Sequence, residues 1–390
     1  MKNTTGCSMK ILLGGVPFGR GNIGDDAILN CAAGIFRRIF PDAQLAAAAF
    51  GAVPSAAKYG VETLPAFGFD PNYSMRDFRK AAKTFDMFVW AGGTGLSDYP
   101  HIGASLLENA QKLGLKTVIW QVGMNRELNP EYFQLHGRML KFTEFFGVTG
   151  YLERQMEKRM RERLQDCVSQ CDLIALRDQP SLIELHNSGE FPAAIFGADS
   201  VILQEASPGN LLVADAQNRR SVGICMAEKL NKRKFQQAVN FLRHLQITEN
   251  VRLVFIPMSS NDRRIMEPLL EHFHVDSGNV MIEYTSPEDI QNVVKHCSLL
   301  LSGRLQLTIM GLNALVPGIG IANSSKIANC LNMFGLPVFN NQSVIDFDQL
   351  YEECVRWLNT PDFADRAKDV RNRMLKRLEQ CESHLKELAY

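Results

Sequence analysis

The sequence lacks long apolar runs: no uninterrupted stretch of its 390 residues reaches the ~20 apolar residues that a membrane-spanning helix needs. The first fifteen residues, MKNTTGCSMKILLGG, also lack the apolar core of a signal peptide. The nine cysteines are scattered and include no CxxC pair, which favours reduced thiols over a disulfide framework. These absences predict a soluble, cytoplasmic protein.

The sequence also has a formal net charge of zero at pH 7. Lys plus Arg and Asp plus Glu number 42 each, so no overall field draws the protein onto nucleic acid, and we expect no nucleic-acid partner. The sequence contains neither a Walker loop nor a G-x-S-x-G element. What is present, 46% hydrophobic and 22% charged residues, is typical of soluble globular proteins, and the length suits two domains.

Short apolar runs alternate with amphipathic stretches along the whole chain. The pattern predicts strands within 9–15, 43–51, 85–95, 116–124, 173–178, 194–200, 219–227, 251–259, 279–285, 299–302 and 316–322. Helices are predicted within 25–41, 103–114, most of 145–171, 231–246, 262–273, 286–297, between the last two strands, and in a tail at 347–388 that breaks near Pro361. The helix at 286–297 has the best-specified start, a serine followed by proline and glutamate.

Strands that alternate with crossover helices predict parallel sheets covered on both faces. The pattern restarts after residues 204–220, so we expect an α/β protein of two doubly wound, Rossmann-like domains facing a cleft. Their expected limits are 9–205 for the N-terminal domain, 206–345 for the C-terminal domain and 346–390 for a helical tail. Ligands of such folds bind at the carboxyl ends of the strands, where the glycine loops and charges of this sequence fall.

A glycine-rich loop, GGVPFGRGNIGDDAIL, follows the first predicted strand. Gly19, Gly21 and Gly24 have the G-x-G-x-x-G spacing that lets backbone amides approach a ligand at a helix start. A dinucleotide site would also need an acidic residue at the end of the next strand, and AAFGAVPS has none. Asp25 and Asp26 would repel a pyrophosphate, so a hydroxyl-rich ligand fits better, with one aspartate as a base. Alternatively, both aspartates only favour the helix dipole.

An arginine, Arg304, follows the apolar strand LLLS, and a helix is predicted from about Leu305. The fork of a guanidinium beside a helix N-terminus suits a carboxylate or phosphate. The alternative is an ion pair with a neighbouring acid. Lys326, after the next predicted strand, either adds a second positive charge or is an exposed helix lysine.

Five ordered segments carry a resemblance to a known family. They are GNIGDDAIL (21–29), AGGTG (91–95), ALRDQPSLIEL (175–185), GADS around Asp199, and SGRLQLTIMGLNALVPGIGIANSSKIANCLNMFGL (302–336). Together they resemble the polysaccharide pyruvyl transferases over roughly residues 9 to 336. The resemblance implies a GT-B-like fold and transfer of a pyruvyl group from phosphoenolpyruvate to two hydroxyls of a cell-surface polysaccharide precursor, giving a ketal. Phosphoenolpyruvate is then a co-substrate, and neither cofactor nor metal is expected.

The resemblance also implies roles for individual residues. The donor would be bound by Ser302, Arg304, Leu305 and Lys326, and the acceptor by Asn22, Gly24, Asp25, Gly93 and Thr94. Arg304, Gln306 and Asp25 would be catalytic. Arg177 and Asp199 would lie in the cleft, with pairing to Asp178 as the structural alternative for Arg177.

This chain departs from the family at position 306, where a histidine suited to general acid work is replaced by Gln306. Glutamine cannot deliver a proton near neutral pH. Two other functions are therefore kept: a GT-B-type glycosyltransferase using a nucleotide sugar, and a catalytically inactive sugar-binding member of the family. His272 and His274 offer two metal ligands without a third, so we expect no metal site. The acceptor sugar, the oligomeric state and a peripheral membrane contact through the basic tail helix are left open.

Overall fold

The computed structural model of the chain describes residues 8–209, 215, 217–273, 278–283, 286–322, 324–339 and 345–388. Contacts between residues divide the chain into two compact units. The first unit is made of Met1–Arg20, Ala32–Asp199 and Arg377–Tyr390, and the second of Gly21–Cys31 and Ser200–Lys376. These limits differ from the expected domains at the glycine loop, whose part from Gly21 onward groups with the second unit. They also differ at the C-terminal tail, which is shared between the units rather than separate.

The first unit is built on a parallel sheet of seven strands in the order β3-β2-β1-β4-β5-β6-β7. The order runs outward from β1 in both directions, as in doubly wound folds. The strands are β1 Lys10–Phe18, β2 Gln44–Ala49, β3 Val61–Pro65, β4 Met87–Ala91, β5 Lys116–Val122, β6 Leu173–Leu176 and β7 Ile195–Phe196.

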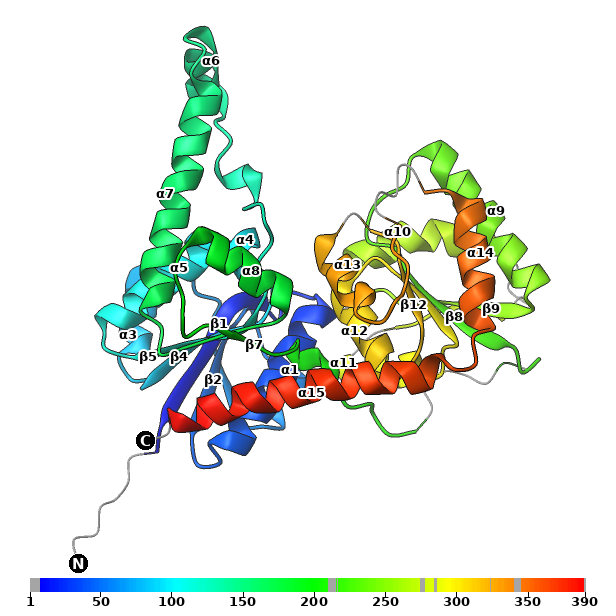
Figure 1. Ribbon diagram of the computed structural model, residues 1–390, viewed down its shortest axis with the longest axis horizontal. Coiled ribbons are helices and arrows are strands. Elements are labelled where there is room, and N and C mark those ends of the chain that lie inside the picture. Colours follow the sequence, from blue (N-terminus) through cyan, green and yellow to red (C-terminus); the bar gives the residue numbers. More distant parts are fainter. Residues whose placement is uncertain are drawn as a thin grey trace, which may run out of the picture. The chain divides into compact units, whose positions relative to one another are not determined.

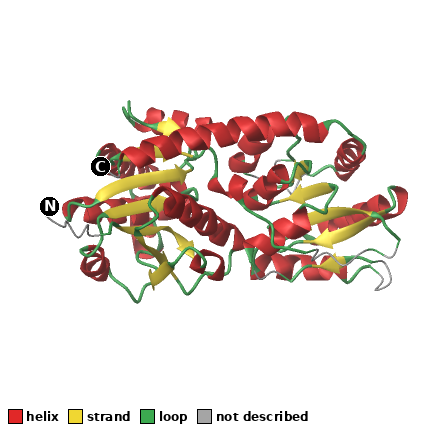
Figure 2. Ribbon diagram, turned by 90° about the horizontal axis from the view of Figure 1, so that it is seen from below, coloured by secondary structure: helices red, strands yellow, loops and turns green. Residues whose placement is uncertain are grey.

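Helices lie on both faces of this sheet (Figures 1 and 2). The helices of this part of the chain are α1 Ile23–Ile39, α2 Pro54–Ala57, α3 Met75–Ala82, α4 Gly95–Asp98, α5 Pro100–Lys112, α6 Gly137–Phe145, α7 Thr149–Ser169 and α8 Gln179–Ser188, with a 3-10 turn at Pro130–Tyr132; α6 lies away from the sheet, at the far end of α7. Helix α1 starts in the segment that groups with the second unit. The strands are apolar almost throughout because both sheet faces are covered.

The second unit has a parallel five-stranded sheet in the order β10-β9-β8-β11-β12. Its strands are β8 Arg220–Cys225, β9 Val251–Phe255, β10 Val280–Met281, β11 Leu299–Ser302 and β12 Gly318–Gly320. Its helices are α9 Lys232–Thr248, α10 Ser260–Leu270, α11 Pro287–Val294, α12 Leu305–Asn313, α13 Ser325–Asn332, α14 Phe347–Leu358 and the first part of α15 Phe363–Glu387, which groups with the first unit from Arg377 onward, with a 3-10 turn at Ser200–Leu203. As expected, Ser286 caps α11 by accepting from the amide of Asp289.

Several elements differ from the sequence prediction. Strand β3 and helices α2, α3, α4 and α6 were not predicted, although Ser74 and Asp77 form a capping box at the start of α3. The long charged helix begins at Thr149 rather than near Phe145, because Gly147 adopts a φ of 64° and separates α6 from α7. In the described part of the chain, no helix combines the length and apolar character needed to cross a bilayer.

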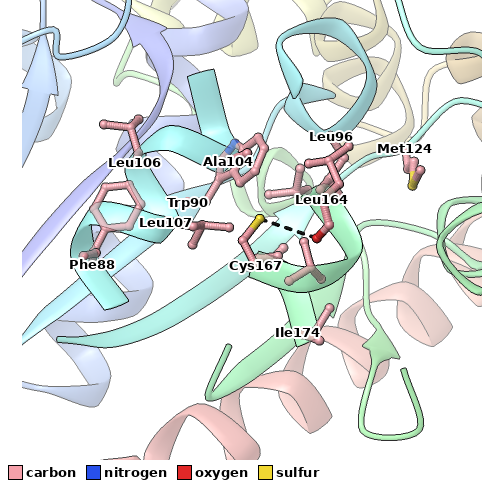
Figure 3. Packing of buried hydrophobic residues seen from close by; sticks show 14 of the residues in the cluster. Phe88, Trp90, Leu96, Ala104, Leu106, Leu107, Met124, Leu164, Cys167 and Ile174 are labelled. Carbon is pink, nitrogen blue, oxygen red and sulfur yellow. Dashed lines mark hydrogen bonds between the residues drawn. The ribbon is translucent and has the colours of Figure 1, made fainter. Parts of the chain in front are cut away.

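Trp90, on β4, is a large buried side chain in the core of the first unit. Its indole is fully buried, and Figure 3 shows it among apolar side chains from β4, α5 and α7. Three glycines make room for the ring: a Cβ atom would lie 2.2 Å from it at Gly15, 2.4 Å at Gly95 and 1.8 Å at Gly103. Part of the glycine content near the AGGTG loop therefore serves packing rather than ligand binding.

We expect Gly103→Ala to lower the free energy of unfolding by about 3 kcal/mol, because overpacking outweighs the better helix propensity of alanine. Gly150→Ala in α7 is the matched control, since the nearest atom to its Cβ would be 3.6 Å away on a flexible arginine. Urea unfolding of both variants measures the effect. Wild-type stability in Gly103→Ala would contradict this account of the Trp90 packing.

Candidate functional site

The carboxyl ends of three neighbouring strands of the second unit meet around one ion pair. Cys225 ends β8, Asp262 lies in the first turn of the helix after β9, and Arg304 follows β11. The parallel order β9-β8-β11 brings these ends to one edge of the sheet. The site is thus formed where ligands of open α/β sheets usually bind.

Arg304 is paired with Asp262. Its Nε and Nη2 atoms donate to the two carboxylate oxygens at 3.1 and 2.6 Å. The Asp262 side chain is fully buried, whereas 33% of the Arg304 side chain is exposed. The structure therefore shows the ion pair that the sequence left open as the alternative for Arg304, and donor binding by this residue stays a prediction. The pair fixes the plane of the guanidinium and leaves its Nη1 edge for a further partner.

Asp262 was missed by the sequence analysis because an aspartate three residues after Ser259 looks like an ordinary helix-cap acid. It does take part in that cap, as Ser259 accepts from its amide. Its carboxylate also accepts from the amide of Met258 at 3.2 Å and from the thiol of Cys225 at 3.8 Å. A buried charge with this many donors is a stable anchor for Arg304.

The pKa values around the pair agree with this arrangement. Burial alone would lower the pKa of the Arg304 guanidinium, but the hydrogen bonds and charge of Asp262, with smaller effects from Cys225 and Asp25, hold it above its ordinary value. Burial, followed by the charge of Asp262, raises the pKa of the Cys225 thiol. The thiol therefore stays protonated and serves as a donor.

The GNIGDD turn lies beside the loop after β9. The amide of Ile23 donates to the carbonyl of Met258 at 2.9 Å, and Asn22 forms an isolated antiparallel bridge with Ser259. Asn22 also caps α1: its Oδ1 accepts from the amide of Gly24 at 3.1 Å. The residues that were predicted to bind acceptor at this turn thus share one unit with the predicted donor residues.

Asp25 has an unusual carboxyl group. Its Oδ2 accepts from Nδ2 of Asn22 at 2.9 Å. Burial, followed by the neighbouring carboxylate of Asp26, raises its pKa to about 7; the Asn22 hydrogen bond and the positive charges of Arg304 and Lys326 lower that pKa only in part. Asp25 therefore exchanges a proton near neutral pH, which ordinary aspartates do not. The dipole-stabilising role considered for it does not account for this environment.

Gln306 lies in the first turn of α12, against Gly24. A Cβ atom at Gly24 would be 3.1 Å from both Cβ and Oε1 of Gln306, so a larger residue there would push the Gln306 side chain aside by a few tenths of an ångström. No side chain caps the start of α12. The position of the family histidine is therefore next to the turn that carries Asp25.

The other residues that were predicted to bind the donor differ in their burial and contacts. The hydroxyl of Ser302 donates to the Arg304 carbonyl at 2.8 Å and accepts from its amide at 3.1 Å, so it stabilises the turn before α12. Leu305 is buried. Lys326 is half-buried on α13, and its charge acts on Asp25. Lys326 thus belongs to the charges around Asp25 and is not the exposed helix lysine considered as the alternative.

The remaining predicted site residues belong to the first unit. Gly93, with a φ of 73°, and the buried Thr94 follow β4. Arg177 and Asp199 are both buried; Nε of Arg177 donates to Asp178 at 3.1 Å, and its Nη1 lies 3.9 Å from Asp199. For Arg177 the structure shows the pairing with Asp178 that was given as its structural alternative, and Asp199 is a second buried acid near its guanidinium.

A pocket of about 780 Å³ is next to the end of β8. It lies between α9 and α10, with Phe235 and Ile265 among its apolar residues and Lys229, Lys232 and Arg264 among its charged ones. Three basic residues around an apolar floor suit an anionic ligand with an apolar or aromatic body. This pocket was not predicted, because its residues come from the loop after β8 and from two helices, with no shared motif.

No metal-binding cluster of three His, Cys, Asp or Glu residues occurs in the described part of the chain. Nδ1 of His272 lies 2.7 Å from the carbonyl of Pro268, and His274 is outside the described residues. The eight described cysteines form no disulfide.

Two Rossmann-like units define a protein of the GT-B class. Solved structures of this class resemble the chain: HepE of Anabaena in complex with UDP-glucose (12% identity, 98% of this chain and 99% of that chain, TM-score 0.60) and the glycosyltransferase SnogD from Streptomyces nogalater (14%, 98% and 100%, 0.57). The S. aureus MnaA–UDP structure is also similar (10%, 93% and 91%, 0.62). At these identities the likeness shows the fold.

Within this class, the chain belongs to the polysaccharide pyruvyl transferase family, whose sequence model matches residues 22–325. The match confirms the family resemblance that the motifs indicated. None of the curated proteins is significantly similar to the chain.

Proposed function

We propose that the protein transfers a pyruvyl group from phosphoenolpyruvate to two hydroxyls of a sugar in a cell-surface polysaccharide precursor, forming a ketal. One observation carries the proposal: a guanidinium fixed by a buried carboxylate lies at an uncapped helix start, within the electrostatic influence of a carboxyl whose pKa is about 7. This arrangement suits an acidic donor that must be both bound and protonated.

The donor would be held by its negative charges. Nη1 of Arg304 and the first amides of α12 form one anion site, and Lys326 supplies a second positive charge. Asp262 acts here as a positioning residue, since it holds two of the three guanidinium nitrogens. An arginine fixed in advance binds without the cost of ordering its long side chain.

Asp25 would supply the proton that Gln306 cannot. A carboxyl with a pKa of about 7 titrates in the range of an imidazole, and Gly24 brings its turn against Gln306. Protonation of C3 of phosphoenolpyruvate makes C2 electrophilic, and a sugar hydroxyl then adds to C2 and returns its proton to Asp25. The C2–O bond to phosphate then breaks, the second hydroxyl adds to C2, and its proton passes to the departing phosphate, so the ketal and inorganic phosphate are the products.

The test is phosphate release from phosphoenolpyruvate in the presence of lipid-linked or nucleotide-linked sugars. We expect release that depends on the acceptor and a product heavier than the acceptor by a pyruvyl ketal, measured by mass spectrometry. Absence of both with every acceptor, together with activity in a Gln306→His variant, would indicate a sugar-binding member that lacks the chemistry.

The basic and apolar pocket between α9 and α10 favours one other candidate, a glycosyltransferase that uses a nucleotide sugar. Phosphoenolpyruvate is small for a pocket of about 780 Å³, whereas a nucleotide offers both an aromatic base and a diphosphate. Thermal stabilisation by uridine or guanosine diphosphate but not by phosphoenolpyruvate would favour this second function over the first.

A further inference from the structure

A helical hairpin, residues 137–169, extends from the first unit. It consists of α6 and α7, joined at Gly147, and Figure 1 shows α7 running out beyond the sheet with α6 at its far end. Thr143 ties the turn together: its hydroxyl accepts from that of Thr149 at 2.9 Å. The hairpin contains none of the residues assigned to the site above.

The apolar stripe of α7 is covered at one end and uncovered at the other. Val168 and Leu164 are buried in the core of the first unit, Met160 is 9% exposed, and Met156, one turn nearer the end of the hairpin, is 38% exposed. These residues follow one another at four-residue spacing, so they lie along one helix face.

The far end of the hairpin is the most apolar exposed surface of the described residues. Of their twelve exposed large apolar side chains, seven lie here: Met139, Phe142, Phe145, Phe146, Val148, Tyr151 and Met156. The three phenylalanines touch, with ring centroids 4.9 Å apart for Phe142 and Phe146 and 5.1 Å for Phe145 and Phe146. Phe145 is 83% exposed. We call these seven residues the aromatic tip; a patch of this kind marks an interaction surface.

Three basic side chains occur on the two helices near the aromatic tip, together with one exposed acid, Glu144. Arg138, Lys141 and Arg154 are exposed and have no carboxylate partner among the described residues. The ion pairs of α7 lie nearer the body of the unit, at Lys158–Glu162, Arg161–Glu157 and Arg163–Glu108. The hairpin has seven basic and five acidic residues, whereas the whole chain is balanced. Positive charge therefore flanks the apolar end.

We propose that the hairpin docks the protein onto the surface of a membrane that contains anionic lipids. Phe142, Phe145 and Phe146 enter the interface, and the flanking arginines and lysine contact lipid phosphates. Apolar residues at the end of a projection with cations set behind them are the pattern of interfacial insertion. A second protein copy would need a complementary face along the hairpin, and there the middle of α7 exposes Lys158 and Arg159.

This surface differs from the tail helix that the sequence left open for a membrane contact. The apolar residues of α15 are largely buried: Phe363, Ala367, Met374, Leu378, Cys381 and Leu385. The tail helix therefore has no extended apolar face to offer a bilayer, whereas the hairpin has one. The proposal does not depend on which donor the enzyme uses.

Co-sedimentation of the full chain with vesicles tests the proposal. We expect binding to vesicles of phosphatidylcholine and phosphatidylglycerol in equal parts, weaker binding to phosphatidylcholine alone, and loss of the difference at high salt. The double variant Phe145→Ser/Phe146→Ser should lower partitioning at least about tenfold. Ile247→Ser, which removes an isolated exposed apolar side chain of α9, should bind like the wild type. Failure of the wild type to bind, or unchanged binding of the double variant, overturns the proposal.

A fluorescent reporter gives a second measurement that needs no loss of binding. The three native tryptophans, Trp90, Trp120 and Trp357, are buried and do not contact vesicles. In a Phe145→Trp variant, a change in tryptophan emission on adding vesicles therefore comes from the aromatic tip. The emission of this variant should shift to the blue with anionic vesicles, while that of Ile247→Trp stays unchanged. If the double serine variant instead converts a lipid-free dimer into a monomer, the aromatic tip is an interface between two copies and the membrane proposal is wrong.

Discussion

Arg304→Lys is expected to lower phosphate release from phosphoenolpyruvate by about 10²–10³-fold, the usual cost of removing one preorganised donor to developing negative charge. Lysine keeps the positive charge, so the buried carboxylate of Asp262 still has a partner and the fold should persist. Its ammonium cannot bridge Asp262 and a donor in one plane, as the arginine fork does. Steady-state kinetics measure the loss, with the unfolding temperature of the variant as the check on folding.

Asp262→Asn separates positioning from charge in the same site. The variant keeps Arg304 but removes the carboxylate that aims it, so both KM for the donor and kcat should worsen, by less than in Arg304→Lys. Because Asp262 is fully buried, stability should fall as well. If Arg304→Lys retains activity within about twofold of wild type, Arg304 is a structural partner of Asp262 and nothing more.

Most of the fold could be predicted because apolar runs and cap residues are local signals. Ser286 marks a helix start by its own sequence neighbours, and the strand before Arg304 is apolar enough to be recognised as buried. Strand β3 could not be recognised this way, since VETLP has neither alternation nor a continuous apolar run. Helix α3 was missed although the Ser74 and Asp77 capping box was present in the sequence.

The site was predicted less completely than the fold. Arg304 was identified from its place after a strand, but its partner lies 42 residues earlier, and the pair exists only because β9 and β11 flank β8 in the sheet. No local pattern carries that information. Arg177 was predicted to lie in the cleft. In the structure it is buried and lies near two carboxylates, those of the adjacent Asp178 and of the buried Asp199. Contacts across strands settle such cases, and a sequence alone does not contain them.

Asp25→Asn is expected to lower activity by about 10²–10⁴-fold, the range for removal of a general acid. Because the proposed role needs the protonated carboxyl and its pKa is raised to about 7, wild-type activity should fall as the pH rises through about 7. In the variant that falling limb should vanish from whatever activity remains. A pH profile of kcat/KM between pH 5 and 9 measures both effects.

Asp26→Asn is the matched control for this prediction. The charge of Asp26 helps to raise the pKa of Asp25, so its removal should move the falling limb to lower pH while activity at acidic pH persists. A profile that rises through pH 7 in the wild type would contradict the acid role and assign Asp25 to the ionised form, as a base. Equal losses in the two variants would contradict a specific role for Asp25.

The same carboxyl should also leave a signature in stability. The pKa of Asp25 is about 7 in the folded protein and about 4 when unfolded, so between these values the folded state binds the extra proton. The free energy of unfolding should therefore decrease as the pH rises from about 4 to about 7, and Asp25→Asn should remove this part of the decrease. Urea unfolding across that window measures it, independently of any substrate. A wild type and variant whose stabilities change in parallel over the window would show that the Asp25 carboxyl has an ordinary pKa, and the proton-donor role would lose its physical basis.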